Sequence, residues 1–247
     1  SLDSPVAHKY QGYKGIQPFR TAIKDFYQNN YNVKLDPNSQ ILPLIGSKEG
    51  IMHISLAFLD EGDEVLIPNP GYPTYSAVTK IVGAKPIYYS LKESKSWLPD
   101  INELTKLDLS KVKIMWINYP NMPTGAGCSL NFFKNLIGLC VQNGILLVND
   151  NPYSFILNEN PTSLLYNNEN CENCLELNSL SKSHNMAGWR LGMVVGSKNN
   201  IQSILKIKSN MDSGMFFPVQ QGAIEALNQN KKWYSDLNSI YKKRKDI

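Results

Sequence analysis

The segment from Asn178 to Gly192, NSLSKSHNMAGWRLG, holds the residues whose chemistry is easiest to interpret. Serines surround Lys182, and Arg190 follows eight residues later. The flanking stretches CLELNSLS and GMVVG have strand-like patterns, so Lys182 is predicted in a tight loop between two strands. The pKa of a lysine falls on partial burial, and a neutral amine can form a Schiff base. Serine hydroxyls and an arginine fork are donors suited to a phosphate. The alternative is a surface Ser-Lys loop with a structural arginine.

A carboxylate and an aromatic residue stand at the ends of two other apolar runs. Asp150 follows the strand-like ILLV of residues 145–148, at the end where open α/β sheets place their ligands. A carboxylate there needs a positive partner, either an arginine from elsewhere or a protonated ring nitrogen. Tyr72, held in NPGYPTY after a short apolar run, could stack on a planar ligand. As an alternative, Tyr72 only closes the end of the core.

A possible anion site lies further upstream. The run ILPLI is followed by GSKEG, which predicts a strand, a glycine turn and a helix beginning near Ser47 and Lys48. Backbone N–H groups at a helix N-terminus attract anions. The glycine spacing is not that of a Walker loop, and a glycine at such a turn is common for purely structural reasons.

Strands and helices alternate along the chain, which predicts a three-layer α/β/α architecture with a mostly parallel central sheet. The predicted strands are 41–45, 65–67, 85–91, 113–118 and 145–148, together with the two beside Lys182. The predicted helices begin after the glycine at 46 and cover 74–82, 101–107, 129–143, 198–213 and 218–228. A polar amphipathic segment ends the chain without a stop signal.

Composition excludes several classes of protein. The 247 residues include 42% hydrophobic and 19% charged side chains with a net charge of +4, which is ordinary for a globular protein and argues only weakly for nucleic acid. No apolar run reaches membrane-spanning length, and the first residues lack the features of a signal peptide. The chain begins without methionine, which suggests a fragment or a processed form.

Four cysteines are too few for a disulfide framework and favour a reduced, cytoplasmic setting. Cys171 and Cys174 form a C-x-x-C in a polar stretch, NNENCENC. No second pair at zinc spacing exists, so a structural role is favoured over a metal or redox role.

A lysine amine, a strand-end carboxylate, a stacking aromatic and phosphate donors together suit one ligand, pyridoxal 5'-phosphate. From Tyr10 to about Gln220 the chain resembles the class I/II aminotransferases, which are fold-type I pyridoxal-phosphate enzymes. The resemblance rests on S-x-S-K with an arginine eight residues on, D-x-x-Y, N-P-G-Y-P-x-Y and x-P-T-G, in the family's order. It implies transfer of an amino group between an amino acid and a 2-oxo acid.

The resemblance also implies roles for individual residues. Lys182 corresponds to the Schiff-base lysine, Asp150 to the carboxylate that keeps the pyridine nitrogen protonated, and Tyr153 to the donor to the ring oxygen O3′. Tyr72 corresponds to the ring-stacking aromatic. The residues that resemble the phosphate site are Ser47, Lys48, Ser179, Ser181 and Arg190. Tyr10 corresponds to the tyrosine that reaches the neighbouring subunit's cofactor, which implies a homodimer with shared active sites.

The chain departs from the family pattern in two ways. Met122 stands where the family usually has an asparagine that contacts O3′, and Asn121 or Asn118 is expected to substitute. Residues 1–230 match the large cofactor-binding domain, and 231–247 match the start of a helix that connects it to a small domain. That small domain, which in the family carries the arginine for the substrate carboxylate, is not in this chain, so poor substrate binding is expected.

Other functions on the same fold stay open at this point. A pyridoxal-phosphate lyase or decarboxylase would use the same site, and a regulatory module can retain an aminotransferase-like domain. The motifs favour an aminotransferase. We expect no nucleic-acid or membrane partner.

Overall fold

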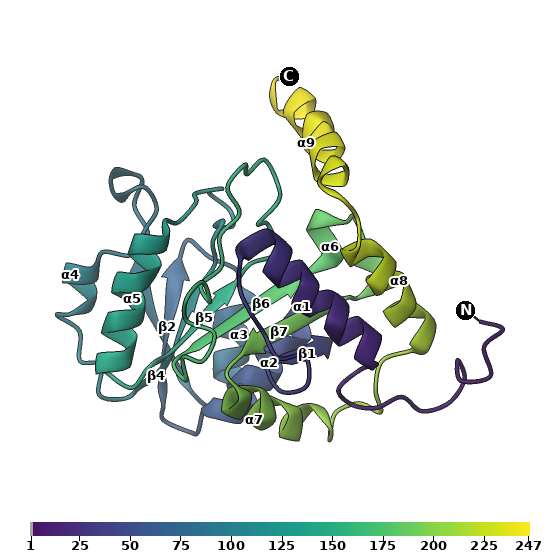
Figure 1. Cartoon of the computed structure of the whole chain (residues 1–247). Helices are drawn as coiled ribbons and strands as arrows, with labels where there is room; N and C mark the ends of the chain where they lie inside the picture. Colours follow the sequence, from purple (N-terminus) through teal and green to yellow (C-terminus); the bar gives the residue numbers. More distant parts are fainter. Residues whose placement is uncertain (1) are drawn as a thin grey trace.

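A seven-stranded sheet forms the centre of the molecule in the computed structural model, which describes residues 2–247 (Figure 1). The strand order is β1-β7-β6-β5-β4-β2-β3, and among the described strands β7 alone runs in the opposite direction to the others, so that its pairings with β1 and β6 are antiparallel. The mostly parallel α/β sheet expected from the sequence is confirmed. The strands are β1 Ile41–Leu44, β2 Glu64–Asn69, β3 Lys85–Ser90, β4 Val112–Ile117, β5 Leu146–Asp150, β6 Cys174–Ser179 and β7 Gly192–Gly196.

Helices cover both faces of this sheet (Figure 1). Helices α2, α3 and α7 lie together on one face, and α1, α5 and α8 contribute to the core on the other. The helices are α1 Gln17–Tyr31, α2 Ser47–Phe58, α3 Thr74–Ile81, α4 Ile101–Leu104, α5 Leu130–Gln142, α6 Leu180–Ser183, α7 Lys198–Lys208, α8 Phe217–Leu227 and α9 Lys231–Lys245, with 3₁₀ turns at Glu93–Lys95 and Ala187–Trp189.

The strands alternate their side chains between two hydrophobic cores, as the two-residue period of a strand requires. Met115 and Ile117 of β4 join the core under α1, α5 and α8, whereas Ile114 and Trp116 join the core under α2, α3 and α7. Because both faces are covered, the central strands are mostly apolar, with only Lys113 charged in β4, which is why they could be recognised from sequence.

Two helices are shorter than the sequence suggested. The expected helix 101–107 ends at Leu104, and the expected helix 198–213 ends at Lys208. In the second case Asp212 accepts hydrogen bonds from the Lys208 ammonium and from the Gly214 amide, and Gly214 has φ +90°. This turn redirects the chain, because a positive φ cannot continue a right-handed helix.

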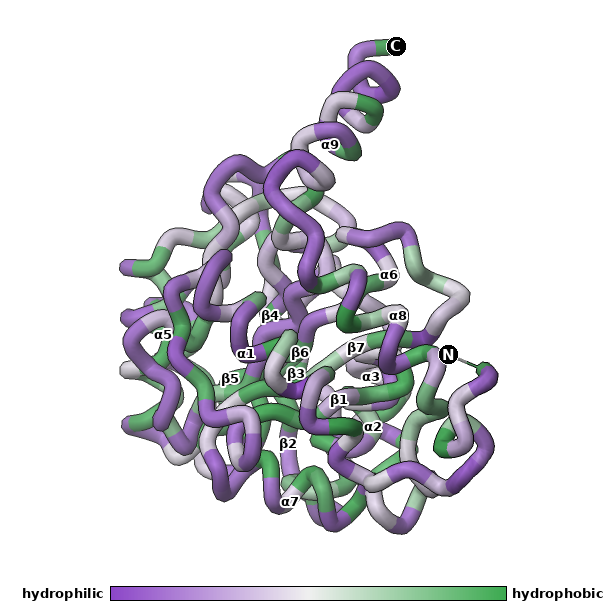
Figure 2. The backbone as a smooth tube through the Cα atoms, turned by 45° about the vertical axis from the view of Figure 1, so that its right-hand side comes forward, coloured by the Kyte–Doolittle hydropathy of each residue, from purple (hydrophilic) through white to green (hydrophobic). Residues whose placement is uncertain are grey.

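Helix α9 extends away from the rest of the fold, with the C-terminus at its tip (Figure 1). Figure 2 shows that it is largely hydrophilic. Its buried residues are Tyr234 and Leu237, Asn238 donates to the Phe155 carbonyl at 2.8 Å, and the Tyr241 hydroxyl donates to the Asn185 side-chain oxygen at 3.0 Å. None of the helices within residues 2–247 combines the length and apolarity needed to cross a membrane.

The parallel strands deliver the predicted functional residues to a single edge of the sheet. Asp150 is the last residue of β5, Ser179 is the last residue of β6, and Tyr72 follows β2. Because β7 is antiparallel, its first residue, Gly192, lies at this same edge and brings Arg190 with it. The carboxyl edge is therefore where a ligand site is expected in such a sheet.

Candidate active site

A cavity of about 300 Å³ opens at the carboxyl edge of the sheet. It brings together nine of the residues selected from the sequence, which come from segments more than 130 positions apart. Its lining residues are Ser47, Lys48, Tyr72, Tyr75, Asn118, Met122, Asp150, Pro152, Tyr153, Ser179, Ser181, Lys182, Ala187 and Arg190.

Asp150 is the charged group at the floor of this cavity and is only 5% exposed. Its Oδ2 accepts a hydrogen bond from the Tyr75 hydroxyl at 2.9 Å, whereas its Oδ1 is buried without a partner among the described residues. Burial raises the pKa of Asp150 to about 6. The negative charge of Glu176 also raises this pKa, whereas the hydrogen bond from Tyr75 lowers it. An unpaired buried carboxylate oxygen is costly, and a cation placed against it would relieve that cost.

Tyr75 is a site residue that the sequence analysis did not select. It is the last tyrosine of NPGYPTY and lies in the first turn of α3, whereas Tyr72 precedes this helix. Its ring stacks on Trp116 with centroids 5.0 Å apart, which fixes the hydroxyl toward Asp150.

Lys182 lies on the single helical turn α6 rather than in a loop, which corrects the expectation from sequence. Ser179 caps this turn, because its Oγ accepts the Ser181 N–H at 3.1 Å. The Lys182 ammonium lies 5.9 Å from the centre of the Tyr153 ring. The cap therefore fixes the direction in which β6 delivers the lysine to the cavity.

The opposite end of the cavity is rich in hydrogen-bond donors. Ser47 and Lys48 begin α2, and the Arg190 guanidinium lies against Gly46, where an ideal Cβ would be 3.0 Å from its central carbon. A Cβ on Gly192 would lie 2.5 Å from the Ser47 backbone nitrogen. The two glycines thus allow the helix terminus, the arginine and β7 to lie close together, and the backbone N–H groups of a helix terminus favour an anion.

Comparison with known proteins decides the family. The family described as "Aminotransferase class I and II" matches residues 1–247. The chain belongs to the class I and II aminotransferases.

Two relatives of this aminotransferase family are named LL-diaminopimelate aminotransferase. The protein of Aquifex aeolicus is 41% identical over 249 residues, covering 100% of this chain and 64% of that protein. The protein of Natranaerobius thermophilus is 42% identical over 242 residues, which cover 97% of this chain and 63% of that protein. Among solved structures, apo-BacF from Bacillus subtilis has a TM-score of 0.93 at 33% identity, covering 99% of this chain and 62% of that one. The chain thus spans less than two thirds of the length of these relatives.

The two asparagine side chains near x-P-T-G have different surroundings: Asn118 lines the cavity, whereas Asn121 bonds within the turn. Asn118 lines the cavity; its amide donates to the Asp150 carbonyl at 2.6 Å and its oxygen accepts from the Met122 N–H at 2.7 Å. The Asn121 oxygen accepts from the Thr124 hydroxyl at 2.8 Å, and Asn121 is not among the lining residues. Met122 lines the cavity, as its position in the motif suggested.

Tyr10, like Asn121, was selected from the sequence as a cofactor-binding residue but does not line the cavity. It is 91% exposed and lies in the segment that packs beside the turn at residues 213–216. Gly214 permits this packing, since a Cβ there would collide with the Gln11 backbone.

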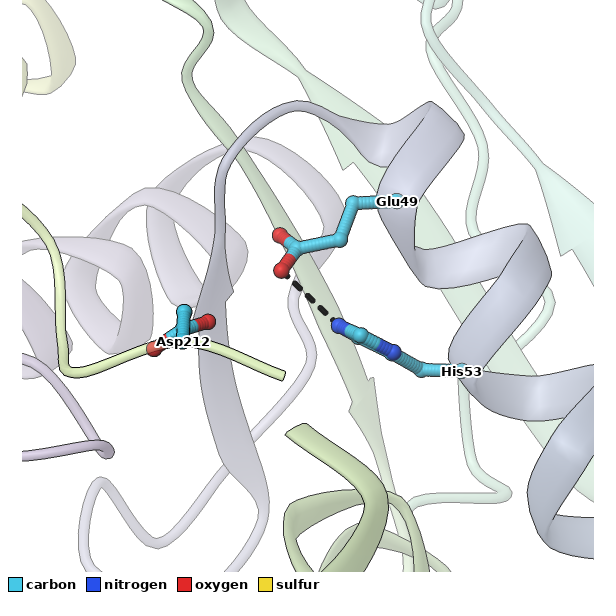
Figure 3. Close-up of side chains that lie close together, drawn as sticks. All are labelled: Glu49, His53 and Asp212. Atoms are coloured by element: carbon cyan, nitrogen blue, oxygen red, sulfur yellow. Dashed lines mark hydrogen bonds and ion pairs between the residues drawn. The ribbon is translucent and has the colours of Figure 1, made fainter. Parts of the chain in front are cut away.

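A cluster of charged residues ties this turn to the start of α2. Figure 3 shows Glu49, His53 and Asp212 facing one another, with His53 Nε2 at 2.8 Å from Glu49 Oε1. The three have the spacing of possible metal ligands, but the fully buried ammonium of Lys208 bonds Asp212 and lies 3.7 Å from Glu49. Lys208 therefore supplies the positive charge, and the cluster is best explained as a buried ion-pair network.

Proposed function

We propose that the chain is the cofactor-binding part of a pyridoxal-phosphate-dependent aminotransferase, which moves an amino group between an amino acid and a 2-oxo acid. The observation that carries the proposal is the unpartnered Asp150 Oδ1 in the same cavity as Lys182. Family membership supports it independently.

The residues present fit this cofactor at both ends of the cavity. A protonated pyridine nitrogen offers Asp150 the positive partner that the protein itself does not, and the anion site around Ser47 and Arg190 suits the phosphate. When bound, pyridoxal phosphate supplies an aldehyde that captures amines and a ring that accepts an electron pair.

At the ring end, Asp150 would hold the ring nitrogen in its protonated form. The Tyr75 hydroxyl stabilises the ionised carboxylate and so favours this charge pair. Tyr72 would stack on the ring, and Tyr153 would donate to its hydroxyl oxygen. Met122 offers no donor there, which leaves Tyr153 and Asn118 as the polar groups beside that oxygen.

At the phosphate end, Ser47, Ser179 and Ser181 would donate hydroxyl hydrogen bonds, while Lys48 and Arg190 would supply positive charge. Arg190 has φ +55° and donates to the Ala187 carbonyl at 2.9 Å. This contact fixes the guanidinium beside the N-terminus of α2, so its remaining donors are oriented before a ligand arrives.

Lys182 would perform the proton transfers. Lys182 lines the cavity from a capped turn, so its amine would hold the aldehyde and would take up and return the substrate's α-proton.

The name of the two curated relatives suggests the donor. We propose LL-diaminopimelate, with its two amino acid groups, as the amino donor of the protein from which this chain comes. We also propose that residues 1–230 form the large domain and that α9 begins the connection to a small domain. Tyr10, exposed and outside its own cavity, is proposed to reach the cofactor of a second subunit in a homodimer.

A single-turnover assay tests this function. The chain loaded with pyridoxal phosphate is mixed with LL-diaminopimelate, and the 2-oxo acid and ammonia formed are quantified. We expect 2-oxo acid without ammonia, and none from Lys182→Ala. Release of ammonia or carbon dioxide, or equal turnover by Lys182→Ala, would contradict the proposal.

A further inference from the structure

The two cysteines of the C-x-x-C lie in direct contact, remote from the cavity in the fold. Cys174 Sγ donates a hydrogen bond to Cys171 Sγ at 3.2 Å, and the Cys174 N–H donates to the Cys171 carbonyl at 3.1 Å. The four residues thus form a turn closed by a backbone hydrogen bond, and this turn brings the two sulfur atoms into contact. We propose that Cys171 and Cys174 form a reversible intrachain disulfide, a redox modification site independent of the amino-transfer site.

The turn is held on both sides by other elements, so the thiols stay paired. The Glu172 carboxylate accepts from Ser197 Oγ at 2.8 Å, and its carbonyl accepts from the Asn200 amide at 2.8 Å, which ties the turn to the start of α7. Asn173 donates to the Ile145 carbonyl at 3.0 Å and accepts from the Leu147 N–H at 2.8 Å, which ties it to β5. An anchored dithiol loses little further entropy when it closes.

The two thiols have different access, as an attacking and a resolving cysteine require. Cys171 is partly exposed, whereas Cys174 is fully buried at the start of β6. The Cys174 hydrogen bond lowers the pKa of Cys171 to about 6, while burial raises the pKa of both Cys128 and Cys140 to about 12. Cys171 is therefore the thiol expected to react first.

The exchange needs an oxidant, for which we take a low-molecular-weight disulfide such as glutathione disulfide. The Cys171 thiolate attacks one of its sulfurs, forms a mixed disulfide and releases one glutathione thiolate. Cys174 then loses its proton to water and attacks the Cys171 sulfur, which releases the second glutathione. Two protein thiols are oxidised to one disulfide, and one glutathione disulfide is reduced to two thiols.

Peptide mapping can identify this bond. The native chain is equilibrated in glutathione buffers of graded ratio, alkylated, and cut after glutamate without reduction. Cleavage after Glu169, Glu172 and Glu176 places the two cysteines on separate peptides, 170–172 and 173–176. We expect these peptides to be recovered joined, with Cys128 and Cys140 alkylated. Cys171→Ser should abolish the joined product, and Cys128→Ser, which alters a cysteine outside the pair, should not.

The folded geometry predicts how readily the bond forms. Because the turn is anchored, we expect the equilibrium constant for disulfide formation to be at least about tenfold larger in the native chain than in urea, or about 30 mV. An equal or smaller constant in the native chain would overturn the proposal. So would four alkylated thiols throughout the titration, or a disulfide that joins Cys140 or another chain.

Discussion

At the scale of single residues, the site depends on one buried charge left unpaired. Asp150 has one oxygen bound to Tyr75 and one without a partner among the described residues, and burial raises its pKa to about 6. A carboxylate arranged in this way is poorly solvated by the protein alone, and it is prepared for a cationic ligand.

Replacement of the carboxylate should weaken cofactor binding without unfolding the chain. Asp150→Asn keeps the shape but removes the charge, and a hydrogen bond to a charged group contributes about 1.5–3 kcal/mol. We therefore expect pyridoxal phosphate to bind roughly 10- to 150-fold more weakly, measured by fluorescence titration. The exposed Asp108→Asn is the control. Unchanged affinity in Asp150→Asn would contradict the proposed charge pair.

The Tyr75 hydroxyl should set the pH dependence of that binding. Its hydrogen bond lowers the pKa of Asp150, so Tyr75→Phe should raise this pKa and move the acid limit of cofactor binding upward by roughly 0.5–1 pH unit. Tyr119→Phe, which removes a hydroxyl bonded to the Trp97 carbonyl, is the control and should leave the limit in place. A downward shift in Tyr75→Phe would be inconsistent with this role.

At the scale of elements, the donors proposed to bind the phosphate lie together because β7 and the start of α2 approach closely. Gly192 makes the approach possible by leaving no side chain against the Ser47 amide. Behind this contact, Lys208 of α7 forms ion pairs with Glu49 of α2 and with Asp212 in the following turn. The helix terminus is thus fixed from two sides.

A methyl group at Gly192 should displace the helix terminus. A Cβ 2.5 Å from the Ser47 nitrogen forces β7 and α2 apart, so Gly192→Ala should lose about 1–3 kcal/mol of unfolding free energy and also bind phosphate-bearing cofactor more weakly. Gly138→Ala, within α5 and with nothing near its Cβ, should instead gain roughly 0.5–1 kcal/mol. Chemical denaturation compares the two, and equal stabilities would refute the steric argument.

Removal of the buried ammonium should be more costly than removal of an exposed one. Lys208→Met leaves Glu49 and Asp212 without their cation and should lose about 3–5 kcal/mol of unfolding free energy. Lys206→Met, on the exposed side of the same helix, should change it by less than about 0.5 kcal/mol. Similar losses in both variants would argue against the network.

At the scale of the whole molecule, α9 is attached to the catalytic side of the fold through α6. The Trp233 indole donates to the Ser183 carbonyl at 3.0 Å, and His184 contacts the Tyr234 hydroxyl at 3.3 Å. Both contacts involve residues directly after Lys182, so they join α9 to the turn that carries the lysine.

Acid should weaken this attachment. Burial lowers the pKa of His184 to about 4, so the unfolded chain binds a proton below about pH 6.5 that the folded chain does not bind until about pH 4. The free energy of unfolding should therefore fall as pH drops from 6.5 to 4. His184→Gln should remove this part of the slope, and the exposed His8→Gln should not. A slope that persists in His184→Gln would contradict the assignment.

The sequence predicted the fold and most of the cavity for physical reasons. Covered parallel strands are mostly apolar, and their carboxyl ends fall at a single edge, so Asp150 and Lys182 could be placed together in advance. The helical turn of α6 was missed because its N-cap, Ser179, is also the last residue of strand β6. Tyr75 was missed because its contact with Asp150 spans 75 positions, and the ion-pair network because Lys208 and Glu49 meet only in the folded chain.

The most direct test of the account is covalent capture of the cofactor. The chain is incubated with pyridoxal phosphate, its visible absorbance is recorded, and it is reduced with borohydride before peptide mapping. The account predicts a visible band that disappears on reduction and a label on Lys182, with Lys182→Ala unlabelled and Lys48→Ala still labelled. A label at other lysines, or equal labelling of Lys182→Ala, would contradict the central claim.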